Sequence, residues 1–374
     1  MKKIMALLLS LILVCGLAAC SKPASGDSPA TTEQTAAANT GSDASKEETA
    51  GGKELTKLRV AVQPYYNGMQ MAYILDKDLG TQYGLELEPI LFSNGATANE
   101  ALAADQWDVT LTGGAFVFGV ANYGAKIVGS HINGTGGNEL YVRADSPIAS
   151  VKGYNPTYPD IYGSPETVKG AKIIIATGTT SQQCAVKWLE AIGVNEEDVE
   201  LVNMDYATGY QAFLSGEADA VVLVSPYCYD APAQGWVKAA DLVNLHAANY
   251  EEIMCTAKAY EQMPDAIASF VALVYMANDA LEADPALKLE YCMKWYADNA
   301  NPVEESSAQA ECDLKPLVTS QEAAGLELGV YEVDYAEFMV SVDKLDASQV
   351  DTVRSCMAQD ILNAALEKLA QWTN

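Results

Sequence analysis

Histidine is scarce in this sequence, and its scarcity excludes several kinds of chemistry. His131 and His246 are the only two histidines in 374 residues, which leaves no dense histidine metal site and no recognisable Ser-His-Asp or His-Glu-x-x-His arrangement. The glycine-rich run at 134–137 lacks the Lys-Ser/Thr that ends a phosphate-binding loop. We therefore expect no catalytic residue, no metal site and no cofactor, so the chain is not expected to be an enzyme.

Basic residues are also few. The chain has 22 Lys and Arg against 50 Asp and Glu, a formal net charge of -28 at pH 7. Nucleic-acid binding needs basic patches that pair with phosphates, so we expect no nucleic-acid partner. An acidic balance of this kind is typical of an exposed protein that stays soluble.

The apolar run at the N-terminus is too short to span a bilayer. Two lysines precede apolar residues 4–14, whereas a spanning helix needs about 20 apolar residues, so residues 1–19 are predicted to be a secretory signal peptide. The run closes with Leu-Ala-Ala-Cys at 17–20, which resembles the lipobox of bacterial lipoproteins. We expect lipidation of Cys20 and a mature protein tethered to the extracytoplasmic face of the cell membrane.

Aromatic residues are absent from the segment that follows. Residues 21–57 consist mainly of Ala, Thr, Ser, Gly and Glu, which is too little apolar surface to offset the entropy lost on ordering. We therefore predict a disordered linker over 20–57 and a globular body from residue 58 onward.

Paired cysteine motifs are missing as well, because no Cys-x-x-Cys occurs. An even number of cysteines follows the anchor, which permits disulfides, but several lie in apolar patterns where a buried free thiol is ordinary. Their oxidation state is left open: Cys184, Cys228, Cys255, Cys292, Cys312 and Cys356.

From residue 58 onward, short β-rich runs alternate with helical segments. Residues 58–62 predict a strand, 69–79 a helix and 85–90 a second strand, the opening unit of an α/β domain. The same order restarts with a buried strand over 171–176 and a helix over 182–192. The sequence therefore predicts two α/β lobes in one chain.

A loop-rich stretch with four prolines, 146–169, is predicted to mark the crossing into the second lobe. It contains a tyrosine- and proline-rich insertion, 154–162, which could be a surface loop of the lobe or a lid over the cleft. The predicted divisions are 58–145 for the first part of lobe 1, 146–250 for lobe 2, and 251–374 for a return to lobe 1. In the return, helices are predicted at 266–281, 285–299 and 348–372.

Four stretches, 58–64, 103–114, 168–181 and 214–227, carry a family resemblance. They resemble the substrate-binding proteins of ABC importers of the nitrate/sulfonate/taurine type, whose relatives include binders of a thiamine-pyrimidine precursor. The resemblance covers about 58–245 and implies the type II periplasmic-binding-protein fold, in which two lobes close on a ligand like a hinge. At Val224 and Ser225 the chain departs from the family's usual aromatic-acid pair, so the ligand of better-known members is not carried over.

In open α/β sheets, ligands bind beyond the carboxyl ends of strands, where free amide groups at helix N-termini and short polar side chains gather. Only Lys77 is basic between Arg59 and Lys126. The ligand could therefore be an anion, or a neutral, aromatic or amine-bearing molecule held by tyrosines and Asp205. The predicted ligand-binding residues are Gln63, Tyr65, Asn67, Thr112, Gly113, Gly114, Thr179, Thr180, Ser181, Asp205, Ser225 and Tyr227.

The resemblance implies a monomeric extracytoplasmic solute-binding protein. It would capture a sulfonate-, nitrate- or taurine-type molecule, or a pyrimidine-like one, and deliver it to an ABC permease and its ATPase. Two alternatives are a receptor that reports ligand to a membrane sensor, and an enzyme of the same fold related to thiamine-pyrimidine synthesis, although the cysteine-rich iron motif of that enzyme has no match here.

Overall fold

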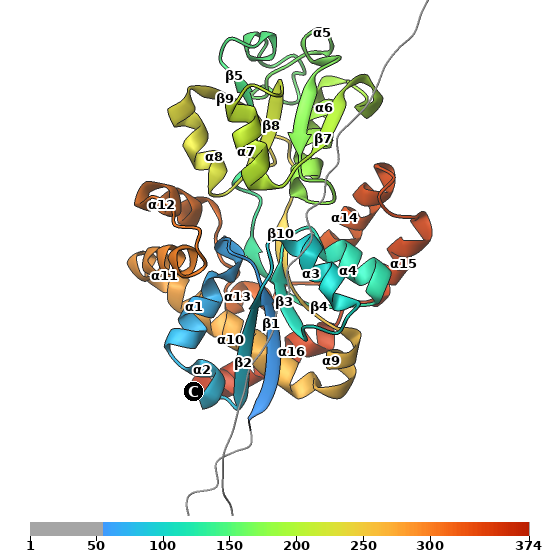
Figure 1. Ribbon diagram of the computed structural model, residues 1–374. Coiled ribbons are helices and arrows are strands. Elements are labelled where there is room, and N and C mark those ends of the chain that lie inside the picture. Colours follow the sequence, from blue (N-terminus) through green and yellow to red (C-terminus); the bar gives the residue numbers. More distant parts are fainter. Residues whose placement is uncertain (1–54, 374) are drawn as a thin grey trace, which may run out of the picture. The chain divides into compact units, whose positions relative to one another are not determined.

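Two five-stranded sheets form the framework of the computed structural model, which describes residues 55–373 (Figure 1). The predicted signal peptide, Cys20 and nearly all of the predicted linker lie outside the described residues. The strands are β1 (Thr56–Val62), β2 (Leu85–Leu91), β3 (Val109–Thr112), β4 (Lys126–Asn133), β5 (Asn138–Arg143), β6 (Lys172–Ile175), β7 (Glu200–Asn203), β8 (Ala220–Val224), β9 (Trp236–Asp241) and β10 (Tyr250–Cys255).

The two sheets are wound alike. The first has the order β2-β1-β3-β10-β4 and the second β7-β6-β8-β5-β9. In the first, β1 runs parallel to β2 and β3, while β10 is antiparallel to β3 and β4. In the second, β6 runs parallel to β7 and β8, while β5 is antiparallel to β8 and β9. The predicted α/β class with two lobes is confirmed.

Strand sequences follow from their place in these sheets. Central strands such as β8, Ala-Val-Val-Leu-Val, are apolar on both faces because helices cover both. In β6, Ile173 and Ile175 join one apolar core of the second lobe and Ile174 joins the other, as side-chain alternation in a strand requires. The edge strand β2 alternates with glutamates and tolerates Pro89.

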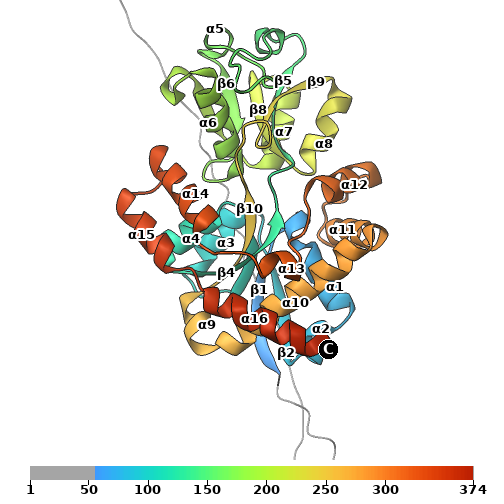
Figure 2. The ribbon, with the colours of Figure 1, turned by 180° about the vertical axis from the view of Figure 1, so that it is seen from behind.

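Helices cover both sheets, and a long C-terminal set belongs to the first. Figure 2 shows α10 and α16 side by side in front of the first sheet, where both contribute to its apolar core. The helices are η1 (Tyr66–Gly68), α1 (Met69–Asp76), α2 (Leu79–Gln82), α3 (Gly95–Leu102), α4 (Phe116–Tyr123), η2 (Pro147–Ser150), α5 (Pro165–Val168), α6 (Thr180–Ile192), η3 (Glu196–Asp198), α7 (Tyr206–Leu214), α8 (Tyr227–Asp230), η4 (Ala231–Gln234), α9 (Ala257–Gln262), α10 (Pro264–Ala283), α11 (Pro285–Asp298), α12 (Glu305–Leu314), α13 (Ser320–Ala323), α14 (Val330–Ser341), α15 (Ala347–Ser355) and α16 (Gln359–Thr373).

The chain crosses between the sheets earlier than the sequence predicted. β5 was expected in lobe 1, but it pairs with β8 and β9 in the second sheet, so residues 134–137 form the first crossing instead of 146–169. The local pattern of β5 identifies a strand without saying which sheet accepts it. The second crossing, residues 242–249, leads from β9 into β10.

The predicted helix over 348–372 is interrupted by tertiary pairing. The Ile127 amide donates to the Cys356 carbonyl at 3.1 Å, and the Ala358 amide donates to the Ile127 carbonyl at 2.8 Å. These bonds tie residues 356–358 to the edge strand β4 as a short bridge. The backbone there pairs with the sheet, so α15 ends and α16 begins anew.

The tyrosine-rich insertion belongs to the surface of the second lobe. The Tyr162 amide donates to the Ala239 carbonyl at 2.8 Å, and the Trp188 indole donates to the Tyr162 carbonyl at 2.7 Å. Its residues do not line the cleft described below.

The structure also shows the surroundings of the most apolar helix and of the cysteines. Among residues 55–373, α10 is the one helix long and apolar enough to span a bilayer, but 72% of its most apolar part is buried inside the protein, as in a core helix. The six cysteines of the described chain are buried free thiols.

Candidate functional site

A polar cleft lies where strands of both lobes end, and it holds about 630 Å³ including its opening to solvent. The turns after β1, β3, β6 and β8 line it, together with residues at the two crossings and a few from β10 and the end of α12. The lining residues are Gln63, Tyr65, Tyr66, Asn67, Asn94, Gly95, Thr112, Gly113, Gly114, Ala115, Asn138, Thr179, Thr180, Tyr206, Val224, Ser225, Asn249, Glu251, Glu311 and Lys315.

The first-lobe wall is built around the turn after β1. The Gln63 amide nitrogen donates to the Leu111 carbonyl at 3.1 Å, and Asn67 Nδ2 donates to Gln63 Oε1 at 3.0 Å. The Trp295 indole fixes the same turn by donating to the Gln63 carbonyl at 3.0 Å. The Asn67 oxygen, Oδ1, is buried and has no hydrogen-bond partner among the described residues.

The second-lobe wall is set by the start of α6. Thr179 caps that helix, because its hydroxyl accepts from the Ser181 amide at 3.1 Å and donates to the Ala176 carbonyl at 2.7 Å. The Thr180 hydroxyl donates to Asn138 Oδ1 at 2.6 Å, which ties α6 to the first crossing.

Side chains of the two lobes meet across the cleft. The rings of Tyr65 and Tyr206 lie edge to face with centroids 6.1 Å apart. Burial raises the pKa of both phenols above its ordinary value, so both stay neutral hydroxyls. A Cβ on Gly114 would come within 2.4 Å of the Tyr335 hydroxyl and 3.1 Å of Thr180 Cγ2, so this position has room only for glycine.

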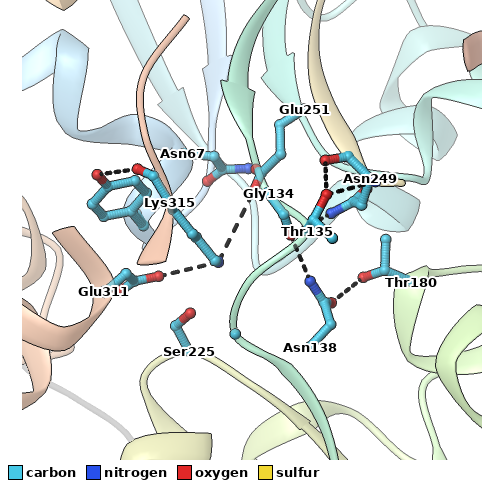
Figure 3. A network of polar contacts seen from close by, with 12 residues as sticks. Asn67, Gly134, Thr135, Asn138, Thr180, Ser225, Asn249, Glu251, Glu311 and Lys315 are labelled. Atoms are coloured by element: carbon cyan, nitrogen blue, oxygen red, sulfur yellow. Dashed lines mark hydrogen bonds and ion pairs between the residues drawn. The ribbon is translucent and has the colours of Figure 1, made fainter. Parts of the chain in front are cut away.

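Three charged side chains face the cleft from the first lobe. Figure 3 shows the Lys315 ammonium between two carboxylates, with Glu311 Oε1 at 3.2 Å and Glu251 Oε1 at 3.9 Å. Burial works to lower the pKa of Lys315, but the charges of Glu311 and Glu251 raise it above its ordinary value, so the ammonium stays charged. Burial raises the pKa of Glu251, opposed by the charge of Lys315 and a hydrogen bond from Asn67, while the charge of Glu311 raises it further.

The structure brings nine of the twelve predicted residues together in this cleft. They are Gln63, Tyr65, Asn67, Thr112, Gly113, Gly114, Thr179, Thr180 and Ser225.

The other three predicted residues lie outside the lining. Ser181 is buried in α6, where its hydroxyl accepts from the Ala176 amide at 3.1 Å. Asp205 is exposed and caps α7 by accepting from the Thr208 amide at 3.0 Å. The Tyr227 ring packs on Tyr210 with centroids 5.7 Å apart. Each of them satisfies the local structure of its own lobe.

Sequence reasoning missed the charged part of the cleft. The sequence argument considered basic residues only between Arg59 and Lys126, whereas Lys315 enters the cleft from the end of α12, almost 200 residues later. Glu311 and Lys315 lie in a polar interval without clear periodicity, so no local pattern marked them. Asn138 was missed because the first crossing was predicted at 146–169.

Among the described residues, no group of three or more His, Cys, Asp or Glu side chains is placed to hold a metal ion.

Two similarly wound α/β sheets, joined by two crossings around a polar cleft, define the class of periplasmic binding proteins. The fold matches the aliphatic sulphonate-binding protein SsuA of Escherichia coli with a TM-score of 0.63 at 19% identity, over 82% of this chain and 99% of that one. It matches the nitrate-binding protein NrtA of Synechocystis with a TM-score of 0.65 at 11% identity, over 85% and 90%. At these identities the likeness shows the fold alone.

Sequence comparison gives the family. The chain is 32% identical over 313 residues to a Brachyspira hyodysenteriae protein with the provisional name ABC transporter periplasmic binding protein, which covers 84% of this chain and 90% of the relative. Residues 51–294 match the NMT1-like family. The chain belongs to the NMT1-like family, and the resemblance found in the sequence is confirmed.

Proposed function

We propose that this protein is the extracytoplasmic solute-binding component of an ABC importer. It holds one small organic molecule between its lobes and presents it to a membrane permease driven by an ATPase. The single observation that carries the proposal is the cleft itself, because side chains from both lobes and from the second crossing line one polar space.

The cleft supports binding coupled to closure. A ligand that touches both walls favours the closed arrangement only to the extent that it binds that arrangement more tightly than the open one. Contacts such as Tyr65 with Tyr206 already bring the lobes together here, and short crossings of four and eight residues (134–137 and 242–249) are suitable hinges.

The family supports the partners and the location. A relative named for an ABC transporter implies a permease and an ATPase as partners, and work outside the cytoplasm. A lipid anchor at Cys20 and a monomeric state complete the proposal. A non-catalytic role fits the same picture, since binding and release need no reacting group.

A thermal-shift screen of the purified protein tests this function. The panel holds sulfonates, nitrate, pyrimidines, purines and aromatic acids, and a ligand that binds only the folded state raises the melting temperature. At least one compound is expected to raise it, with calorimetry giving one site per chain. Turnover of a panel compound, followed by mass spectrometry, would favour an enzyme instead.

A further inference from the structure

We infer that the cleft selects a ligand that presents a protonated amine or amidinium group to Glu251, and that it discriminates against simple anions. The inference rests on the proposed function, because it assigns a ligand class to the same cleft. It separates this chain from the sulphonate- and nitrate-binding proteins whose fold it shares.

The charge of the cleft lining disfavours anions. Among the described residues that line the cleft, the charged side chains are Glu251, Glu311 and Lys315, two carboxylates against one ammonium. An entering anion would have to approach this excess of negative charge. Coulomb repulsion in a buried site is weakly screened, so the approach is unfavourable.

The ammonium of Lys315 is already committed. It lies 3.2 Å from Glu311 Oε1 and also donates toward that oxygen as a hydrogen bond. Glu311 Oε2 accepts from the Tyr296 hydroxyl at 2.6 Å. Glu311 and Lys315 therefore satisfy each other and belong to the framework, and Lys315 offers little charge to an anion.

Glu251 is the carboxylate left over. Its nearest cation is Lys315 at 3.9 Å, beyond hydrogen-bond distance. Its side chain is only 10% exposed, and burial raises its pKa against the charge of Lys315 and a hydrogen bond from Asn67. Its charged form is therefore costly without a closer cation. A ligand cation would supply the missing partner.

An independent observation points to the same ligand chemistry. Asn67 is 5% exposed and lines the cleft, and its Oδ1 has no hydrogen-bond partner among the described residues. Its Nδ2 already donates to Gln63, and its side chain also hydrogen-bonds Glu251 and so opposes the rise in the pKa of that carboxyl, so the group of Asn67 without a partner is the acceptor Oδ1. A ligand N–H would satisfy it.

The side-chain amides of two other lining residues also have their donors already engaged. Asn138 Nδ2 and Asn249 Nδ2 each donate to the Gly134 carbonyl at 2.8 Å, as Figure 3 shows for Asn138. Their donors therefore hold the first crossing in place. The tyrosine rings add π faces to the cleft at Tyr65 and Tyr206, and such faces attract cations.

The experiment compares matched pairs of opposite charge. Benzamidine is tested against benzoate, and 1,4-diaminobutane against succinate, with nitrate and ethanesulfonate added as anions. Melting temperature and calorimetry are measured on the wild type, on Glu251→Gln, on Asn67→Ala and on the control Glu200→Gln, an exposed carboxylate on β7.

The cationic member of each pair is expected to raise the melting temperature and the anionic member is not. Glu251→Gln should weaken benzamidine binding about ten-fold, the scale of a charge-assisted hydrogen bond. Asn67→Ala should weaken it less, and Glu200→Gln should bind like the wild type. If Glu251→Gln does not fold, the loss of benzamidine binding in Asn67→Ala still tests the inference.

Three results would overturn the inference. Tighter binding of the anionic members would reverse the charge assignment while leaving a solute-binding cleft in place. Equal benzamidine binding by Glu251→Gln and the wild type would remove Glu251 from the site. A melting temperature unchanged by every member of the panel and of the earlier screen would remove the proposed function as well.

Discussion

The strands that follow the two crossings, β5 and β10, each carry a glutamate, and the surroundings of the two glutamates differ. Glu139 on β5 accepts from Lys238 at 3.2 Å and bonds the Tyr141 hydroxyl, so its charge is balanced within the second lobe. Glu251 on β10 has its lysine at 3.9 Å and faces the cleft. Glu139 is therefore paired within its own lobe, whereas no cation among the described residues lies within hydrogen-bond distance of Glu251.

The difference extends to the whole of each wall. The second lobe supplies only neutral groups to the cleft, namely Asn138, Thr179, Thr180, Tyr206, Val224 and Ser225. The first lobe supplies neutral groups from equivalent turns and adds three charges from β10 and the end of α12. Strand-end turns thus provide a common polar surface, while β10 and the end of α12 add the charged side chains of the first-lobe wall.

The largest expected effect comes from breaking the buried ion network of the first lobe. Lys315→Met leaves Glu311 and Glu251 without their cation, and loss of one partner from a buried pair should lower the free energy of unfolding by about 3 kcal/mol. Urea denaturation measures it. Lys172→Met in the second lobe removes a lysine 3.9 Å from the exposed Glu200 and should change stability by no more than about 0.5 kcal/mol. Equal losses would refute the contrast.

Filling the contact between the walls should abolish binding while the lobes stay folded. Gly114→Trp places a ring where Tyr335 and Thr180 already limit the space to glycine, so affinity should fall about 100-fold, measured by calorimetry. Gly325→Trp, at an exposed glycine beyond α13, is the matched control. Unchanged affinity in Gly114→Trp would place the ligand elsewhere.

A third variant sharpens the comparison within β10, where Glu252 is fully buried beside Ser130 and Glu332. Burial and the charge of Glu332 raise its pKa well above the ordinary value, against the hydrogen bond from Ser130 and with a smaller contribution from Glu251. As pH rises past the ordinary pKa, the unfolded chain releases this proton while the folded chain keeps it. The contribution of Glu252 to stability is therefore complete at acidic pH and is lost as pH rises through its raised pKa.

Glu252→Gln removes that dependence. We expect the variant to be more stable than the wild type at pH 8 and to lose this advantage toward pH 4. Urea unfolding at several pH values measures it, with Glu200→Gln as control. A gain that is the same at every pH would contradict the assigned titration.

The smallest effect separates two helix caps of the second lobe. Thr179→Ala and Asp205→Ala each remove a cap and should each lower the free energy of unfolding by about 1 kcal/mol. Only Thr179 lines the cleft, so calorimetry should show weaker ligand binding, by about three-fold, in Thr179→Ala alone. Equal binding losses in both variants would mean that α7 also contacts the solute.

Much of this architecture could be predicted from the sequence because it depends on local patterns. Apolar runs such as β6 and β8, and the small polar residues that follow them, indicated the sheets and nine lining residues. What the sequence did not reveal depends on partners distant in the chain. The sheet that accepts β5, the bridge that interrupts the helix at Met357, and the entry of Lys315 into the cleft are all decided by tertiary packing.

Local capping also explains two predicted residues that lie outside the lining of the cleft. Ser181 and Asp205 have the polar chemistry expected of a strand-end site, yet their side chains satisfy backbone amides beside them. A short polar side chain at a helix start serves the helix or the ligand, and its residue type alone does not distinguish the two.

The account is tested most directly by a crystal structure of the protein with benzamidine, or with whichever compound of the panels raises the melting temperature most. We predict one molecule in the cleft, touching both lobes, with a nitrogen about 3 Å from the Glu251 carboxylate. A molecule bound to one lobe outside the cleft, or an anionic group facing Glu251, would contradict it.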